Sequence, residues 1–267
     1  MIRDVFLNFK DQLNQIVMHF FRKKRQILAD ENRLLKYTRY AVGEVLLIVV
    51  GILLALYLNN LNEEKNVRQD QVRILKELIS NLNSTITAFE RTISTEKSYL
   101  SFNQAIIDHL DHKAPYDTIL DKSFGTYYWT VSTNPVKGAY EHLKAKGLDL
   151  IENDSLRKRI SFLFESEFTI LKEENQFWSN SFQQNISYPY HIRHFRKYYP
   201  KQVHSENYEF AKPMNYEALL EDDYFLSMNT EIISNRRWNI RSLEGLIVKM
   251  ESLKILINQE LEELGAR

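Results

Sequence analysis

The chain has 267 residues, and its 35 Lys and Arg are balanced by 35 Asp and Glu, so the formal net charge is zero. It has no cysteine, which excludes disulfides, thiol catalysis and cysteine-ligated zinc. The charge is unevenly distributed, because the first 40 residues hold nine basic and four acidic residues and the remainder is acidic overall.

Residues 1–36 are interpreted as a basic amphipathic arm on the cytoplasmic side of a membrane. Apolar residues recur near helical spacing, and the basic run Arg22–Arg25 follows them. Such an arm can lie on an anionic inner leaflet, so membrane lipids are predicted partners. Met18 opens the sequence MHFFRKKRQ, which would itself serve as the start of a signal anchor, so Met1 and Met18 are both candidate translation starts.

Residues 37–61 are predicted to be a transmembrane helix. The stretch from Ala41 to Leu58 has 18 residues and a single charge, Glu44. A helix of that length rises about 27 Å, close to the ~30 Å hydrocarbon core of a bilayer. A cleaved signal peptide is the alternative. We favour an uncleaved anchor, because the apolar run is long and no A-x-A-like site follows it.

The charges on either side orient this helix. Basic residues are concentrated before it, whereas the segment after it mixes basic with acidic residues. The positive-inside rule therefore predicts a cytoplasmic N-terminus and an extracytoplasmic helical domain over residues 62–267. In a bacterium the chain would be a single-pass protein of the inner membrane with a periplasmic C-terminal domain, where no nucleic acid is predicted as a partner.

The predicted span has one face of polar and small residues. Glu44, Gly51, Ala55 and Asn59 recur at steps of seven, four and four, which keeps them on one side of a helix. The small pair Gly51 and Ala55 lets the helix pack closely on a second copy or on another membrane protein. Glu44 lies about 8 Å from the middle of the span. It could be a proton or ion relay or a contact to a partner subunit. We favour a carboxyl that reaches the interface, or one that stays protonated and hydrogen-bonded in a homodimer.

A long helix is predicted to continue from the span to about residue 110. No Gly or Pro occurs after Gly51 until Pro115, and seam positions recur in steps of three and four. Ten of the twelve seam residues are apolar, and the exceptions, Glu96 and Asn103, are expected to fix the register of packing. Further apolar residues widen the face and favour a bundle over a two-stranded coiled coil. The seam consists of Val72, Leu75, Ile79, Leu82, Ile86, Phe89, Ile93, Glu96, Leu100, Asn103, Ile107 and Leu110.

Residues 111–153 break this pattern with two prolines and three glycines. The segment Pro135–Lys146 is predicted to be a short helix that the following glycine ends. Asn153 or Asp154 is expected to cap the next helix, over residues 155–182.

The last third of the chain begins with residues 188–201 (YPYHIRHFRKYYPK), which are aromatic and basic and are predicted to be a loop. Residues 202–212 are also predicted to be loop. Asn215 is expected to cap a helix over residues 216–227, and a last long helix over residues 229–264 has its own apolar seam. The chain is therefore predicted to be all-α, with three substantial helices and at least two short ones outside the membrane.

The span also carries a recognisable pattern. Its elements are Lys36-Tyr37, Tyr40-Ala41-x-Gly43-Glu44, Gly51-Ile52-x-x-Ala55 and Asn59-Asn60-x-Asn62-Glu63. This pattern resembles an uncharacterised family of bacterial single-pass membrane proteins, a domain of unknown function, over roughly residues 18–165. The chain departs from it at Leu61, where the family usually has Trp. The resemblance implies an envelope location and no known activity.

The sequence lacks the common catalytic motifs. The chain has no Gly-rich phosphate loop, no HExxH and no GxSxG, so no catalytic residue or cofactor is predicted and the protein is not expected to be an enzyme. His191 and His194 lie one helical turn apart, with His204 beyond. A metal site needs three or four ligands and no matching acid is identifiable, so no metal is predicted.

The basic residues Arg193, Arg196, Lys197 and Lys201 could contact anionic envelope components, although we favour a solvated basic loop. The sequence thus predicts a membrane-anchored structural, interaction or sensory protein of the bacterial cell envelope. The alternative is a subunit of an ion-driven envelope complex that uses Glu44, by a likeness of architecture to peptidoglycan-tethered stator subunits.

Overall fold

The computed structural model describes residues 34–199 and 209–266. The chain divides into two compact units, Met1–Asn66 and Val67–Arg267. One helix, α2 (Leu34–Asp111), contains all the described residues of the first unit and is also the first element of the second.

In the first unit the described residues form an uninterrupted helix, as the sequence predicts. Large apolar side chains from Val42 to Leu61 are exposed, and only 6% of the 18-residue apolar window is buried. The core helix of a soluble domain would be mostly buried. Among the described residues, this is the one helix long and apolar enough to cross a membrane. The predicted arm over residues 1–36 lies outside the described residues except for its last three.

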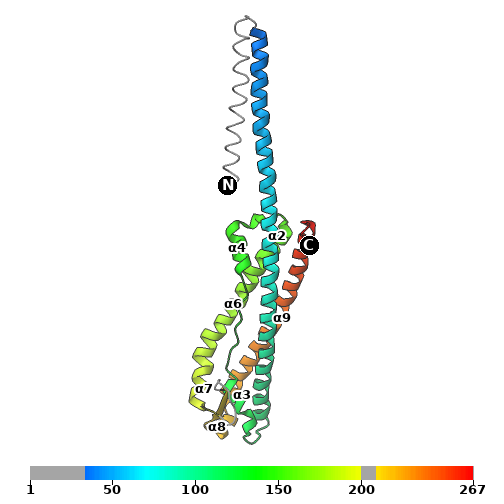
Figure 1. Ribbon diagram of the computed structural model, residues 1–267. Coiled ribbons are helices and arrows are strands. Elements are labelled where there is room, and N and C mark those ends of the chain that lie inside the picture. The colour runs from blue at the N-terminus through cyan, green and yellow to red at the C-terminus, as the bar shows by residue number, and fades with distance from the viewer. Residues whose placement is uncertain (1–33, 200–208, 267) are drawn as a thin grey trace. The chain divides into compact units, whose positions relative to one another are not determined.

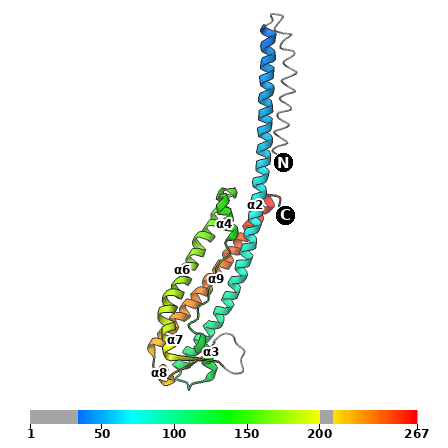
Figure 2. The ribbon, with the colours of Figure 1, turned by 60° about the vertical axis from the view of Figure 1, so that its left-hand side comes forward.

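The second unit is built on three long helical segments. Helix α9 (Asp223–Glu263) runs antiparallel beside α2, and a helical run packs along both (Figures 1 and 2). This run consists of α5 (Asp154–Ser161), the π-helical η3 (Phe162–Glu167), α6 (Phe168–Phe177), the π-helical η4 (Trp178–Ser187) and α7 (Tyr188–His194). The predicted all-α class is confirmed.

Short elements connect α2 to this run. The chain turns through η1 (Thr118–Leu120) and α3 (Asp121–Thr126), returns along the unit, and forms α4 (Gly138–Lys146) and η2 (Leu148–Leu150) (Figure 1). Helix α4 confirms the predicted short helix. It ends at Gly147, whose φ of 107° is a conformation that glycine adopts readily.

Capping residues mark two of the predicted helix starts. The Asn153 side chain accepts a hydrogen bond from the Leu156 N–H at 3.1 Å, so Asn153 rather than Asp154 caps α5. Asn215 caps α8 (Tyr216–Leu220) in the same way.

Several predicted boundaries are wrong. The helix predicted over residues 155–182 continues to His194, because η4 carries it through without a break. The segment predicted as a basic loop forms α7 and then strand β1 (Phe195–Tyr198). Strand β2 (Phe210–Pro213), which begins inside the second predicted loop, pairs antiparallel with β1 and supplies its hydrogen-bonding partner.

The predicted helix over residues 216–227 is also wrong, because α8 ends at Leu220. Helix α9 begins at Asp223, before the predicted residue 229, since the Asp222 side chain accepts a hydrogen bond from the Phe225 N–H at 3.0 Å. Asp222 is thus a second helix cap directly after α8.

Two separate apolar clusters form the interior of the second unit. The first cluster joins α2, α4, the run from α5 to α6, and the C-terminal half of α9, with Phe89, Tyr140 and Phe168 among its buried rings. The second joins the end of α2 to α3, α7, β1, α8 and the start of α9, around Tyr127 and Phe225. The predicted seam of α2 supplies buried residues to both.

Candidate functional site

A layer of polar side chains lies between the two apolar clusters. On α2 the buried residues of the first cluster end at Ile93 and those of the second begin at Ile106. On α9 the corresponding limits are Ile240 and Ile232, and Asn229 lies one turn before Ile232. The side chains of this polar layer are all buried: Glu96, Asn103, Asn229, Arg236 and Asn239. Burying a polar group costs free energy unless the group has a hydrogen-bond partner. The role of the layer therefore depends on the hydrogen-bond partners of each side chain.

Arg236 is the centre of this polar layer. Its Nη1 donates to Glu96 Oε2 at 2.6 Å, and the two side chains are only 3% and 4% exposed. Its Nε donates to Asn103 Oδ1 at 2.9 Å. Its Nη2 donates to the backbone carbonyls of Tyr127 at 3.1 Å and Trp129 at 2.6 Å. One guanidinium therefore ties α9 to α2 and to the segment that follows α3.

The remaining polar groups complete the network. Asn239 Nδ2 donates to Glu96 Oε1 at 3.1 Å, so both carboxylate oxygens of Glu96 are paired. Asn103 Nδ2 donates to Asn229 Oδ1 and to the Tyr127 carbonyl. The layer has one positive and one negative charge, and its main chemical capacity is to hold three chain segments together.

The environment of Arg236 affects its ionisation. Burial lowers the pKa of the guanidinium from its usual value, and the adjacent Glu96 opposes that effect. The group stays charged at neutral pH because the ordinary pKa of arginine lies far above 7. The Tyr99 ring, 5.1 Å from the guanidinium carbon, adds a cation–π contact, and burial raises the pKa of Tyr99.

The sequence pointed to two of the five residues of this site. Glu96 and Asn103 interrupt the predicted seam of α2, and both are in the polar layer. Arg236 was missed, although a signal exists: it lies four residues before Ile240 and so continues the seam of α9 in the same alternating steps. Asn229 lies one heptad further back.

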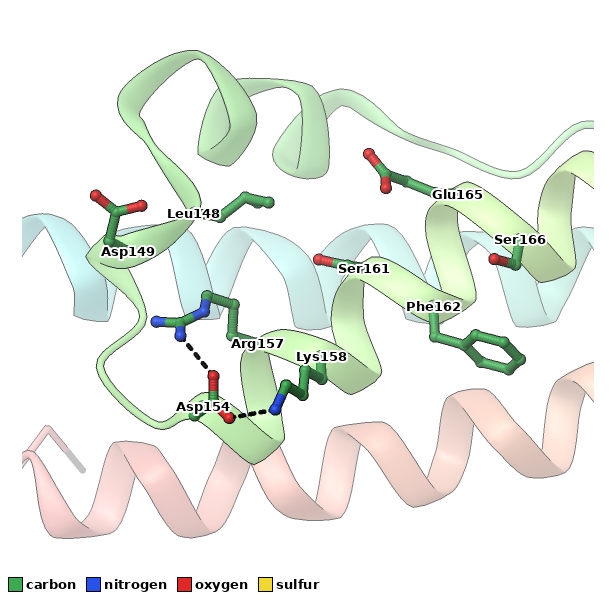
Figure 3. Close-up of a pocket in the computed structure, with 9 residues that line it drawn as sticks. All are labelled: Leu148, Asp149, Asp154, Arg157, Lys158, Ser161, Phe162, Glu165 and Ser166. Carbon is green, nitrogen blue, oxygen red and sulfur yellow. Dashed lines mark hydrogen bonds and ion pairs between the residues drawn. The ribbon is translucent and has the colours of Figure 1, made fainter.

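An open hollow of about 790 Å³ lies over the start of the α5–α7 run (Figure 3). Figure 3 shows Asp154 between two cations, Arg157 and Lys158, each 2.6 Å away. Lys158 is the main cause of a lowered pKa at Asp154. Glu165, also in this hollow, accepts from Lys144 at 3.0 Å. These exposed charges neutralise one another, and the hollow has no converging set of catalytic groups.

The predicted face of the span lies on α2 in the first unit. Gly51, Ala55 and Asn59 are exposed there, and Glu44 is on the same helix. A Cβ atom placed on Gly51 would meet nothing within 4 Å. The face is therefore free of close contacts at Gly51, and its role stays a prediction.

The predicted anionic-surface contact involves residues in different environments. Arg193 and Arg196 are exposed, whereas Lys197 is half-buried with its Nζ over the Tyr128 ring at 5.4 Å and the Trp129 ring at 5.2 Å. Lys201 lies outside the described residues. Lys197 thus has an internal contact that the sequence did not indicate.

The two histidines of the predicted pair, His191 and His194, also lie in different environments. His191 is buried against the Tyr128 ring at 4.4 Å, and burial, with a smaller effect of Lys197, lowers its pKa to about 3. His194 instead stacks on Tyr190 at 4.1 Å. His204 lies outside the described residues, and among those described no group of three His, Asp or Glu side chains could hold a metal ion.

Comparison of the chain with protein-family models, curated proteins and solved structures found no match. The fold and the site define the class: an all-α protein whose described residues include one helix that could span a membrane and a helical unit with a buried ion pair between its two apolar clusters. The resemblance of the span to an uncharacterised bacterial family stays a prediction.

Proposed function

We propose that this chain is a single-pass membrane protein whose second unit is a helical interaction or sensory domain of the bacterial cell envelope. One observation carries the proposal: the apolar window of α2 is 6% buried, so no core formed by the described residues requires it. The second unit has two apolar clusters of its own. An exposed helix of this composition is stable in a bilayer and costly in water. The proposal assigns no catalytic chemistry to the chain.

We further propose that the N-terminus is cytoplasmic and that the second unit lies in the periplasm. The basic flank before the span and the mixed flank after it support this orientation. An alkaline phosphatase fusion after Arg267 should be active and a green fluorescent protein fusion there dark. Fusions after Lys36 should give the reverse pattern. Phosphatase activity after Lys36 combined with fluorescence after Arg267 would contradict the orientation.

The partner of the span is proposed to be a second copy or another membrane helix, packed on the face with Gly51 and Ala55. Because a Cβ at Gly51 meets nothing within 4 Å, Gly51→Leu should not disturb the chain itself, and any loss of association would arise at a partner helix. Gly43 is equally open but lies to the side of this face, so Gly43→Leu is the matched control. Crosslinking in membranes should show fewer oligomers for Gly51→Leu only. Unchanged oligomers would refute this packing.

Glu44 motivates a second candidate, a subunit of an ion-driven envelope complex. A carboxyl inside an apolar span is costly and often serves ion or proton transfer. Glu44→Gln preserves shape and most hydrogen bonding but cannot titrate. If the variant assembles normally and loses ion-driven activity, the second candidate is favoured. If assembly and activity both persist, the structural or interaction role is favoured.

A further inference from the structure

An exposed apolar strip follows the outer side of the α5–α7 run. Phe162, Ile170 and Phe177 are each more than half exposed. They recur at steps of eight and seven, and the step of eight passes through η3, whose π-helical turn is wider, so the three side chains lie on one face. Figure 3 shows the Phe162 ring projecting from the run on the side of α9.

Helix α9 has a second strip of exposed residues. Trp238, Val248 and Ile255 are large and apolar, whereas Gly245 and Ser252 between them are small, and all five are exposed. They recur in alternating steps of three, four and seven, which is the spacing of a heptad seam on the side of α9 that faces away from the core. A Cβ atom placed on Gly245 would meet nothing within 4 Å, so no described residue covers this seam there.

An ion pair shows that the two strips are neighbours. Glu167 on the run and Lys249 on α9 lie 2.5 Å apart, and the two segments are antiparallel (Figures 1 and 2). Counting along both helices from this pair, Phe177 lies level with Trp238 to within one residue. The two strips therefore form one continuous surface, which we call the run–α9 face.

The run–α9 face is large enough to hold a partner. Its six large apolar side chains expose roughly 500 Å². That area is at the upper end of what monomeric proteins expose in one patch, and larger patches mark interaction sites. Two such faces would bury about 1,000 Å² of apolar surface, and the polar and small residues beside them bring the total close to the roughly 1,200–2,000 Å² of a stable interface.

One charge on each strip favours a second copy of this chain as the partner. Arg241 interrupts the strip of α9, and Glu174 interrupts that of the run. Neither has an ion-pair partner among the described residues. Counted from Glu167 and Lys249, the two lie at the same level to within one residue. A twofold axis parallel to the helices sets equal levels opposite each other, so Arg241 of each copy would meet Glu174 of the other.

We propose that the run–α9 face binds a second copy of this chain in a parallel dimer with twofold symmetry. Val248 and Ile255 of each copy pack on the run of the other copy, and the small Gly245 lets the two α9 helices approach closely. Arg241 pairs with Glu174 across the interface. The parallel orientation rests on the proposed anchoring of both copies in one membrane, whereas the choice of face rests on the second unit alone.

Crosslinking of the full chain in membranes tests this dimer. The chain has no cysteine, so Gly245→Cys introduces a single thiol in the proposed interface. A short bismaleimide should then give a product of twice the chain mass. Lys172→Cys is the matched control and should give no dimer, because Lys172 is exposed on the same run but lies about 200° around the helix from Ile170. A product that contains another protein in place of a second copy would overturn the choice of partner.

Charge reversal separates the interface from folding. Arg241→Glu or Glu174→Arg alone sets like charges opposite each other at both symmetric contacts, so the crosslinking rate of Gly245→Cys should fall at least about tenfold. Combining the two reversals should restore the rate to within about threefold of the parent, which a folding defect would not do. The proposal is overturned if Gly245→Cys gives no dimer, if neither single reversal slows crosslinking, or if the double reversal does not restore it.

The apolar contact has a test of its own. Val248 is 66% exposed in the single chain, so Val248→Glu should leave the melting temperature unchanged while crosslinking at position 245 falls at least about tenfold. Ile119→Glu, at a residue that is 78% exposed and lies outside this face, should change neither. Equal crosslinking in Val248→Glu and its parent would also overturn the proposal. The fusions that test membrane orientation do not involve these residues, so failure of the dimer and failure of the proposed orientation are distinguishable.

Discussion

Replacing Arg236 by Leu is the sharpest test of the polar layer. The change leaves Glu96 buried without its cation and removes donors from Asn103 Oδ1 and from two backbone carbonyls. Removing one partner of a buried ion pair costs about 3–5 kcal/mol. For a unit of about 200 residues that loss lowers the melting temperature by roughly 6–20 °C, at about 2–4 °C for each kcal/mol.

The control for this experiment lies on the same two helices. Lys97 on α2 pairs with Glu244 on α9 at 2.9 Å, but both side chains are at least half exposed. Solvent screens such a pair, so Lys97→Met should cost no more than about 1 kcal/mol. The assay is urea unfolding of the full chain in detergent, followed by circular dichroism. If Arg236→Leu costs no more than Lys97→Met, the reasoning about the buried charge is wrong.

The double variant Glu96→Leu/Arg236→Leu isolates the ion pair from its surroundings. It removes both charges, although Asn103, Asn239 and the two carbonyls still lose partners. The double variant should therefore be destabilised by about 2–3 kcal/mol less than the sum of the two single variants. Additive losses would show that the two side chains do not stabilise each other.

Two further predictions concern buried positions outside the polar layer. His191 is neutral in the folded chain but takes up a proton in the unfolded chain below pH ~6.5. Its contribution to the free energy of unfolding is therefore complete above that pH and is lost as the pH falls toward 3. Between pH 7 and 4.5, His191→Phe should therefore lose about 2–3 kcal/mol less stability than wild type, and equal losses in the two proteins would contradict this. At Gly125 an added Cβ would overlap the backbone carbonyl of Glu209, so Gly125→Ala should destabilise by about 1–3 kcal/mol. Gly245→Ala, in open space on α9, should stabilise by about 0.5–1 kcal/mol, and the same sign for both glycines would refute the steric argument.

Local signals predicted that the long helices exist, and they predicted two of the helix caps. The seam of α2 follows from spacing alone, and Asn153 and Asn215 cap their helices because a short polar side chain can reach a free backbone N–H. Gly147 ends α4 because its backbone conformation suits glycine. Each of these features is decided by residues within about one helical turn.

Features that depend on distant residues were not predictable. Strand β1 exists because β2 pairs with it, and four-residue strands show little periodicity of their own. Helix α3 contains Gly125, which usually weakens a helix, and tertiary contact overrides that tendency because the backbone at Glu209 needs the space. The run–α9 face likewise depends on segments that meet only in the fold.

The polar layer depends on both helices, because residues of α2 pair with residues of α9. Glu96 and Asn103 are seven residues apart on α2, and Asn229 and Arg236 are seven apart on α9. In the antiparallel packing Glu96 meets Arg236 while Asn103 meets Asn229. Two polar pairs thus match at a spacing of one heptad.

A slip between the helices would break this match. Shifting α9 by one heptad in one direction would set Glu96 opposite Leu243, and in the other it would set Arg236 opposite Phe89, so a buried charge would lie against an apolar side chain in either case. We infer that the layer selects one register among several that the apolar seams would accept. The double Glu96→Leu/Arg236→Leu variant should then fold with more than one register. Spin labels on cysteines introduced at positions 97 and 244 would report this as a broadened distance distribution, since the chain has no cysteine of its own. A single narrow distance equal to that of the labelled parent would mean that apolar packing alone sets the register.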